Sequence, residues 1–341
     1  MKRFANIRFF TLLFFAATCF FSSNGFSEDK VVNIRFSTFF QPTHKMAIIT
    51  EQWGKEVEKR TGGKVKVTQY PGGTLTPAPQ TYDSVVQGVA DAGNTVIGYT
   101  MGKFPLSEVL AFPLGYTSGI TATRLANEYF KKFNPKEFNE VKVLYFHAHG
   151  AGILHTKVPV NKLEDLKGLK IRTLGSNAEF ISSLGGVPVS TPMGDAYDAI
   201  SKGVADGLTC PYESLEGWKL GEVIKYSIEN FTSAYTAVFI VMMNKDKWAS
   251  IPAAQQKIIE QINKEWIEKN GKLWDEMDAT GKKFSLNRGN KVIKLSAKEQ
   301  ARWAAKAQPL NEKYISKMKA KNLPGEEVLK FCQDYLKKHT K

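Results

Sequence analysis

The chain has 341 residues, with 47 Lys or Arg against 33 Asp or Glu, and a formal net charge of +14. This length is sufficient for two domains with buried cores. The lysines are spread along predicted helices and do not gather with arginines and aromatic residues. The composition therefore favours a solvated basic surface and argues against nucleic-acid binding.

The first 27 residues have the pattern of a secretion signal. Lys2, Arg3 and Arg8 precede a mostly apolar run over residues 9–21, and residues 25–27 fit a cleavage site. The run is too short for a comfortable membrane span. Cleavage there would leave about 314 residues with a net charge of +11. We therefore expect a mature protein in the periplasm.

The first part of the mature chain alternates between strand and helix patterns. Apolar and polar residues alternate in the predicted strands, and apolar side chains recur along one face of the predicted helices. A β-α-β-α succession implies parallel strands in a sheet covered by helices. The predicted strands span residues 32–37 and 65–70, and the predicted helices span 42–60 and 78–87.

The same succession starts again near residue 141 and contains an echo of the first part. Residues 87–93 (QGVADAG) resemble residues 202–207 (KGVADG), and each segment joins a helix to the next strand. In both segments a glycine is placed to end the helix. The predicted strands here are 141–146, 169–172 and 187–189, and the predicted helices are 177–184 and 195–201.

The last third contains one apolar strand among long amphipathic helices. A strand that returns after the second α/β unit suggests that the chain crosses between two lobes more than once. The ligand site of such a protein lies in the cleft between the lobes. The pattern predicts a helix over 213–226, a strand over 235–243 and helices over 253–284, 297–319 and 326–338.

We assign residues 28–149 plus 236–277 to lobe I, and residues 150–235 plus 278–341 to lobe II. The fold class is α/β, a two-lobed periplasmic binding-protein fold with hinge strands and a long connecting helix. The cysteines that remain after export, Cys210 and Cys332, lie in different contexts. We expect them to be unpaired.

Motifs for catalysis and for cofactors are not found. The chain has no Gly-x-Ser-x-Gly elbow, no phosphate loop, and no Gly-x-Gly-x-x-Gly after the first strand. His147 and His149 share one face of a strand, but a metal would need further ligands and only His155 is near. We therefore expect no metal, no cofactor and no enzymatic activity. Glu164 and Asp165 are expected to be exposed to solvent.

Arg172 is the most informative single residue, because it ends an otherwise apolar strand. A guanidinium cannot lose its charge and needs an anionic partner. One interpretation is structural, with Asp195 or Asp206 as that partner. The other is functional, with Arg172 binding a solute carboxylate through two parallel hydrogen bonds.

Taken in order, several segments resemble the substrate-binding subunits of tripartite ATP-independent periplasmic (TRAP) transporters. The resemblance covers nearly the whole mature chain and implies a two-lobed receptor that delivers its solute to a sodium-driven membrane permease. An ABC-type importer receptor, a sensory ligand-binding module and an exported enzyme are the alternatives. The segments are residues 65–73, 88–91, 162–172, 184–189, 195–200 and 203–207.

The resemblance implies that Arg172 holds the solute carboxylate and that Met193 lines the pocket. Cys210 stands where the family often has asparagine, and Gly152 stands where the sugar-acid branch has a second arginine. A sugar acid is therefore not expected, and we predict an apolar or aromatic monocarboxylate over a small hydroxy or keto acid. The other predicted contacts are Phe39, Phe40, Thr76, Thr95, Tyr212 and Trp218.

Overall fold

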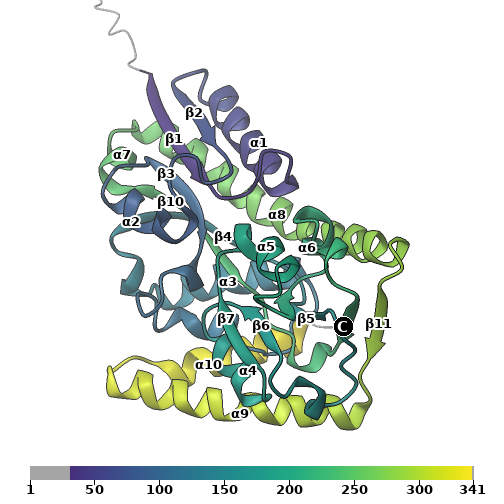
Figure 1. The fold of residues 1–341 in the computed structure, drawn as a ribbon. Coiled ribbons are helices and arrows are strands. Elements are labelled where there is room, and N and C mark those ends of the chain that lie inside the picture. Colours follow the sequence, from purple (N-terminus) through teal and green to yellow (C-terminus); the bar gives the residue numbers. More distant parts are fainter. Residues whose placement is uncertain (1–30, 340–341) are drawn as a thin grey trace, which may run out of the picture. The chain divides into compact units, whose positions relative to one another are not determined.

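The computed structural model describes residues 31–339, and the predicted signal peptide lies outside this range. The described residues form two β-sheets, each packed against helices (Figure 1). The first sheet has five strands in the order β2-β1-β3-β10-β4. Its strands are β1 (Val32–Thr38), β2 (Val65–Tyr70), β3 (Ala92–Val96), β4 (Val141–Ala148) and β10 (Val238–Asn244).

The second sheet has six strands in the order β11-β9-β5-β8-β6-β7. Strand β6, which carries Arg172, lies parallel to both of its neighbours. The strands are β5 (Ile153–Thr156), β6 (Lys170–Thr173), β7 (Val187–Ser190), β8 (Gly207–Cys210), β9 (Tyr226–Glu229) and β11 (Lys291–Lys294).

The longest helix contacts β4 of the first sheet and helix α6, which follows β8 of the second sheet. Helix α8 leads from α7 to β11 and packs against α1, α3 and α6, while α9 lies below α4 in the view of Figure 1. A long connecting helix was predicted and is present. The helices are α1 (Lys45–Arg60), α2 (Thr81–Val86), α3 (Gly119–Phe133), α4 (Asn177–Ser183), α5 (Ala196–Ser201), α6 (Glu213–Gly217), α7 (Lys245–Ala249), α8 (Ala253–Asn287), α9 (Ala297–Ala320) and α10 (Gly325–His339).

The chain crosses between the sheets where β4 is followed by β5, and again where β9 is followed by β10. The two crossing segments pair through Gly152 and Tyr235, whose backbone N–H groups each donate to the other's carbonyl at 2.7 and 3.2 Å. A Cβ atom at Gly152 would overlap the Tyr235 ring. The prediction that β10 returns to the first sheet is confirmed, although β10 lies antiparallel to its neighbours there.

The two echoed segments build the same joint in each sheet. The backbone N–H of Asp91 donates to the Arg35 carbonyl at 3.0 Å, and that of Asp206 donates to the Lys170 carbonyl at 2.7 Å. The carboxylates of the same two aspartates accept the N–H groups of Arg35 and Lys170 at 2.8 and 2.9 Å. Each aspartate therefore fixes a residue of one strand against the turn that leads into a neighbouring strand.

The prediction of a helix over residues 213–226 is wrong. Helix α6 ends at Gly217, a short 3₁₀ turn follows at Leu220–Glu222, and β9 begins at Tyr226. Lys219 adopts a left-handed backbone conformation with φ of 57°, which ends regular helix. The apolar side chains of this segment are buried from a turn and a strand instead of from one helix face.

The lobe ranges stay a prediction. Helix α9 packs against α4 of the proposed lobe II, whereas α10 packs mainly against α3 of the proposed lobe I. The C-terminal segment therefore touches both proposed lobes.

Candidate functional site

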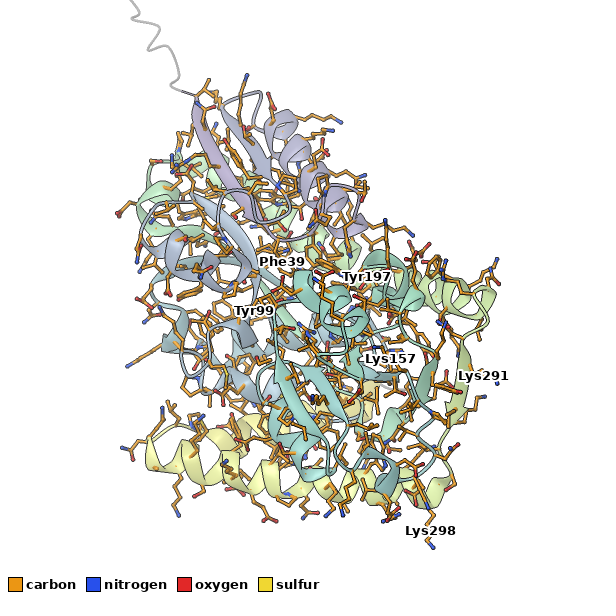
Figure 2. All side chains as sticks on the ribbon, in the orientation of Figure 1. Phe39, Tyr99, Lys157, Tyr197, Lys291 and Lys298 are labelled. Carbon is orange, nitrogen blue, oxygen red and sulfur yellow. The ribbon has the colours of Figure 1, made fainter. Side chains whose placement is uncertain are left out.

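A cavity of about 410 Å³ lies between residues of the two sheets. Its walls come from segments that follow the carboxyl ends of strands, where ligands of α/β proteins commonly bind. Phe39 follows β1, Tyr99 lies in the 3₁₀ turn after β3, and Arg172 and Cys210 lie near the ends of β6 and β8. In Figure 2 the side chains of Phe39 and Tyr99 lie centrally, while Lys291 and Lys298 lie at the periphery.

Arg172 is the one charged side chain among the nine predicted site residues. Its side chain is 4 % exposed, and Nε and Nη2 both donate to the Thr191 carbonyl at 3.0 and 2.7 Å. No carboxylate pairs with it within residues 31–339. Asp206 is bonded to Lys170 instead. The guanidinium is thus oriented by a neutral acceptor, and its charge is left uncompensated.

Tyr99 lies beside this guanidinium. Its hydroxyl accepts the backbone N–H of Met193 at 3.0 Å. Burial raises the pKa of Tyr99, and the positive charge of Arg172 only partly opposes that shift. The phenol therefore keeps its proton, and Tyr99 can act as a second hydrogen-bond donor next to Arg172.

The walls around this charged end are aromatic. The ring of Phe39 stacks on Phe40 with centroids 4.4 Å apart and meets Tyr99 edge-on at 5.8 Å. It lies roughly parallel to Trp218 at 6.2 Å and to Phe239 at 6.3 Å. Such spacings are typical of favourable aromatic contacts, and these rings offer faces and edges to a flat ligand.

Cys210 adds a further weakly polar wall. Its side chain is 2 % exposed and the cysteine is free, as is Cys332 on α10. Burial raises the pKa of the Cys210 thiol, so it stays protonated and behaves as a small apolar group. It is not placed to serve as a nucleophile.

Six of the nine predicted site residues line the cavity: Phe39, Phe40, Arg172, Met193, Cys210 and Trp218. The other three lie outside its lining and bond within the protein. Thr76 bonds to the Ser37 hydroxyl at 2.7 Å, and Thr95 donates to a backbone carbonyl at 2.8 Å. Tyr212 donates to the Glu229 carboxylate at 3.0 Å. These hydroxyls hold the fold around the cavity.

The neighbouring histidines are held by hydrogen bonds inside the protein. Nδ1 of His147 accepts the Trp274 indole N–H at 3.0 Å, and Nε2 of His149 accepts the Ala237 N–H at 2.9 Å. Burial lowers the pKa of His147 to about 3 and that of His149 to about 4. Within residues 31–339, no group of three or more His, Cys, Asp or Glu could hold a metal ion.

Several lining residues were missed in the sequence. Tyr99, Tyr235 and Phe239 form walls, and His149 and Glu213 add polar groups. Tyr99 lies just after β3, so a search beyond the strand that follows residues 87–93 could have found it, whereas Phe239 lies in the middle of the predicted strand over 235–243. Glu213 begins α6 as predicted, but no signal in the sequence indicated that its side chain is buried beside the cavity.

The fold and the cavity are those of a receptor for small molecules. Comparison with known proteins identifies the family to which this receptor belongs. Residues 36–317 match the family model DctP, described as bacterial extracellular solute-binding protein, family 7, and the chain belongs to this family. It is a TRAP-type solute-binding protein and not an enzyme. Within the described residues, no helix is both long and apolar enough to cross a membrane.

Solved structures of related proteins agree with this assignment. A TRAP periplasmic solute-binding protein from Desulfovibrio salexigens is 34 % identical, with a TM-score of 0.80 and coverage of 91 % of this chain and 97 % of the other. A marine metagenome protein specific for aromatic acids, in complex with metahydroxyphenylacetate, is 29 % identical, with a TM-score of 0.86 and coverage of 91 % and 100 %. A Rhodoferax ferrireducens protein with copurified benzoate is 29 % identical, with a TM-score of 0.85 and coverage of 91 % and 99 %.

Proposed function

We propose that this chain binds an aromatic or otherwise apolar monocarboxylate and delivers it to the membrane permease of a TRAP transporter. The observation that carries the proposal is Arg172, a buried cation without an anionic partner within residues 31–339, in a cavity with aromatic walls. A carboxylate offers two oxygens to the planar guanidinium, and Tyr99 adds a further donor.

The apolar walls favour an aromatic body over a polyhydroxylated one. A sugar acid needs buried polar partners for each hydroxyl, and unpaired polar groups in a closed site cost affinity. Phe39, Phe40, Trp218 and Phe239 offer none apart from the indole N–H. At Gly152, an arginine of the sugar-acid type would overlap the Tyr235 ring. Aromatic acids bound by two of the related proteins support the same choice.

Binding would couple to closure of the two proposed lobes. Residues of both line the cavity: Phe39 and Tyr99 from residues 28–149, Arg172 and Trp218 from 150–235. A ligand shifts an equilibrium between open and closed forms only by its preference for one of them. Contacts made by the aromatic body with both lobes at once would supply that preference.

The place of action would be the periplasm. The family is extracellular, and the predicted signal over residues 1–27 precedes the described part of the chain. Expression of the full chain in a Gram-negative host tests this proposal. Mass spectrometry of the periplasmic fraction should give a mature protein that begins after Ser27, whereas an intact protein in the cytoplasm would contradict export.

Calorimetry on the purified chain tests the ligand class and the role of Arg172. Benzoate and phenylacetate should bind and glucuronate should not. Arg172→Ala should weaken binding more than tenfold, since a hydrogen bond to a charged group contributes about 1.5–3 kcal/mol. Arg172→Lys should also weaken it, because the planar fork is lost.

Arg288→Ala is the matched control, because Arg288 is exposed and lies outside the cavity lining. Unchanged benzoate affinity in both Arg172 variants, or tight binding of glucuronate with no response to benzoate, would refute the proposed function.

A further inference from the structure

A buried acid, Glu213, lines the same cavity as Arg172. Its side chain is 3 % exposed at the start of α6. Oε2 accepts the Ser214 hydroxyl at 3.0 Å, and Oε1 lies 2.7 Å from Nε2 of His44. Gly217 makes room for this arrangement, because a Cβ atom there would overlap both Glu213 and His44.

The imidazole of His44 does not neutralise Glu213. Nδ1 of His44 accepts the backbone N–H of Met46 at 3.1 Å, as the N-cap of α1. A nitrogen that accepts a hydrogen bond carries no proton, so the ring is neutral and its proton is on Nε2. His44 therefore faces Oε1 of Glu213 as a neutral imidazole, and the pair keeps the negative charge of Glu213.

The other neighbours leave that charge in place. Oδ1 of Asp278 accepts the Glu213 backbone N–H at 2.8 Å. Burial raises the pKa of Asp278 to about 8, and the charge of Glu213 adds to the shift, so Asp278 is mainly protonated at neutral pH. No ion pair joins Glu213 to Arg172 in the described part of the chain.

Cys210 lies within reach of both charges. Burial is the main cause of its raised pKa, which Arg172 lowers and Glu213 raises further. The cavity is therefore bipolar, with a cation in one wall and an anion in another. Because charges interact strongly in a site of low dielectric constant, each of these two side chains attracts or repels charged groups anywhere on a bound ligand.

We propose that Glu213 determines specificity: its buried negative charge lets the cavity accept one carboxylate, at Arg172, and reject ligands that carry a second one. This inference rests on the proposed function and narrows its substrate class to monocarboxylates. Like charges placed close together in a desolvated interface strongly disfavour the wrong partner.

Three meta-substituted benzoates test the inference by calorimetry on the wild-type chain. 3-Nitrobenzoate and isophthalate have nearly the same shape, but only isophthalate carries a second negative charge. 3-(Aminomethyl)benzoate carries a positive charge that is also costly to bury. Isophthalate should bind at least about 100-fold more weakly than 3-nitrobenzoate and also more weakly than the aminomethyl compound.

Glu213→Gln tests whether the negative charge of Glu213, and not the general cost of burying a second ionic group of the ligand, weakens isophthalate binding. The amide keeps the size of the side chain and removes its charge. It should reduce the preference for 3-nitrobenzoate over isophthalate by at least about tenfold. Glu216→Gln, an exposed position on the same helix, should leave the preference unchanged.

Three results would overturn the inference. These are an unchanged preference in folded Glu213→Gln, isophthalate binding to the wild type at least as tightly as the aminomethyl compound, and equal affinity for all three ligands. The wild-type series remains decisive if Glu213→Gln does not fold. Failure of benzoate and all three compounds to bind would instead refute the proposed function itself.

Discussion

At the scale of single residues, the site consists of a fixed cation among rings. The Thr191 carbonyl orients Arg172 without neutralising it, and Tyr99 keeps a proton beside it. A buried charge without a counter-charge is unfavourable, so under the proposed function a bound carboxylate would remove a cost that Arg172 carries. The same cost makes binding sensitive to the loss of either partner.

Gly152 should be intolerant of any side chain. Gly152→Ala places a Cβ atom against the Tyr235 ring, which is held by a 2.9 Å hydrogen bond to the Thr209 carbonyl. We expect the free energy of unfolding to fall by about 1–3 kcal/mol, as for other overpacked sites. Tyr235 lines the cavity, so ligand affinity should fall as well.

Urea denaturation and calorimetry measure both effects. Gly194→Ala is the control, because a Cβ atom there meets nothing within 4 Å. Equal stability of Gly152→Ala and the wild type would show that the crossing segments do not pack as described.

The sequence was informative about Arg172 because a guanidinium at the end of a mostly apolar strand needs an anionic partner. It was less informative about Phe239, because an apolar residue that faces a cavity and one that faces a core follow the same alternation. Thr76 and Thr95 were predicted to contact the ligand, yet each hydroxyl bonds inside the fold. Pocket membership of such residues depends on contacts between distant segments.

At the scale of elements, the two echoed segments share a structural role. Asp91 and Asp206 each bond a strand residue through both backbone and side chain. Burial alone would raise the pKa of Asp91, but hydrogen bonds from Arg35 and the charge of Lys247 outweigh it and lower the pKa. The charged form of Asp91 is therefore favoured in the folded state.

Removal of these carboxylates should destabilise the fold unequally. Asp206→Ala removes an acceptor for the Lys170 N–H, and we expect a loss of about 1 kcal/mol. Asp91→Ala also leaves Arg35 without its ion-pair partner, so a larger loss of about 2–3 kcal/mol is expected. Urea denaturation at pH 7 measures both, and an equal or reversed order would contradict this description of the joints.

Element types were predictable wherever the periodicity was long, as in α8 and α9. The segment after α6 was not. Its apolar residues recur at helical spacing, but the left-handed conformation of Lys219 and the pairing of β9 with β5 and β11 decide the outcome. Strand pairing between residues far apart in sequence overrides local propensity.

At the scale of the whole molecule, the returning strand was the signal for the topology. An apolar strand after the second α/β unit predicted that the chain crosses back, and β10 lies within the first sheet. The packing of α10 against α3 had no comparable signal, because an amphipathic helix does not indicate which surface it covers.

Three buried histidines should make the fold sensitive to acid. Burial lowers the pKa of His147 to about 3, and those of His149 and His155 to about 4. The unfolded chain binds these protons near pH 6.5, so stability present above that pH is lost as the pH falls toward 4. Each histidine contributes up to about 1.4 kcal/mol per pH unit in this window.

Urea denaturation at pH 7, 5.5 and 4.5 measures this loss. His155→Gln should show a shallower fall than the wild type, since it removes one of the three groups. A wild-type stability that stays constant from pH 7 to 4.5 would contradict the burial of neutral imidazoles.

The proposed function requires that Arg172 binds the carboxylate of an aromatic acid inside the cavity. A crystal structure of the mature chain with benzoate tests this requirement. We expect a carboxylate hydrogen-bonded to the Arg172 guanidinium and to the Tyr99 hydroxyl, with the ring among Phe39, Trp218 and Phe239. A benzoate bound elsewhere, with Arg172 bonded only to Thr191, would contradict it.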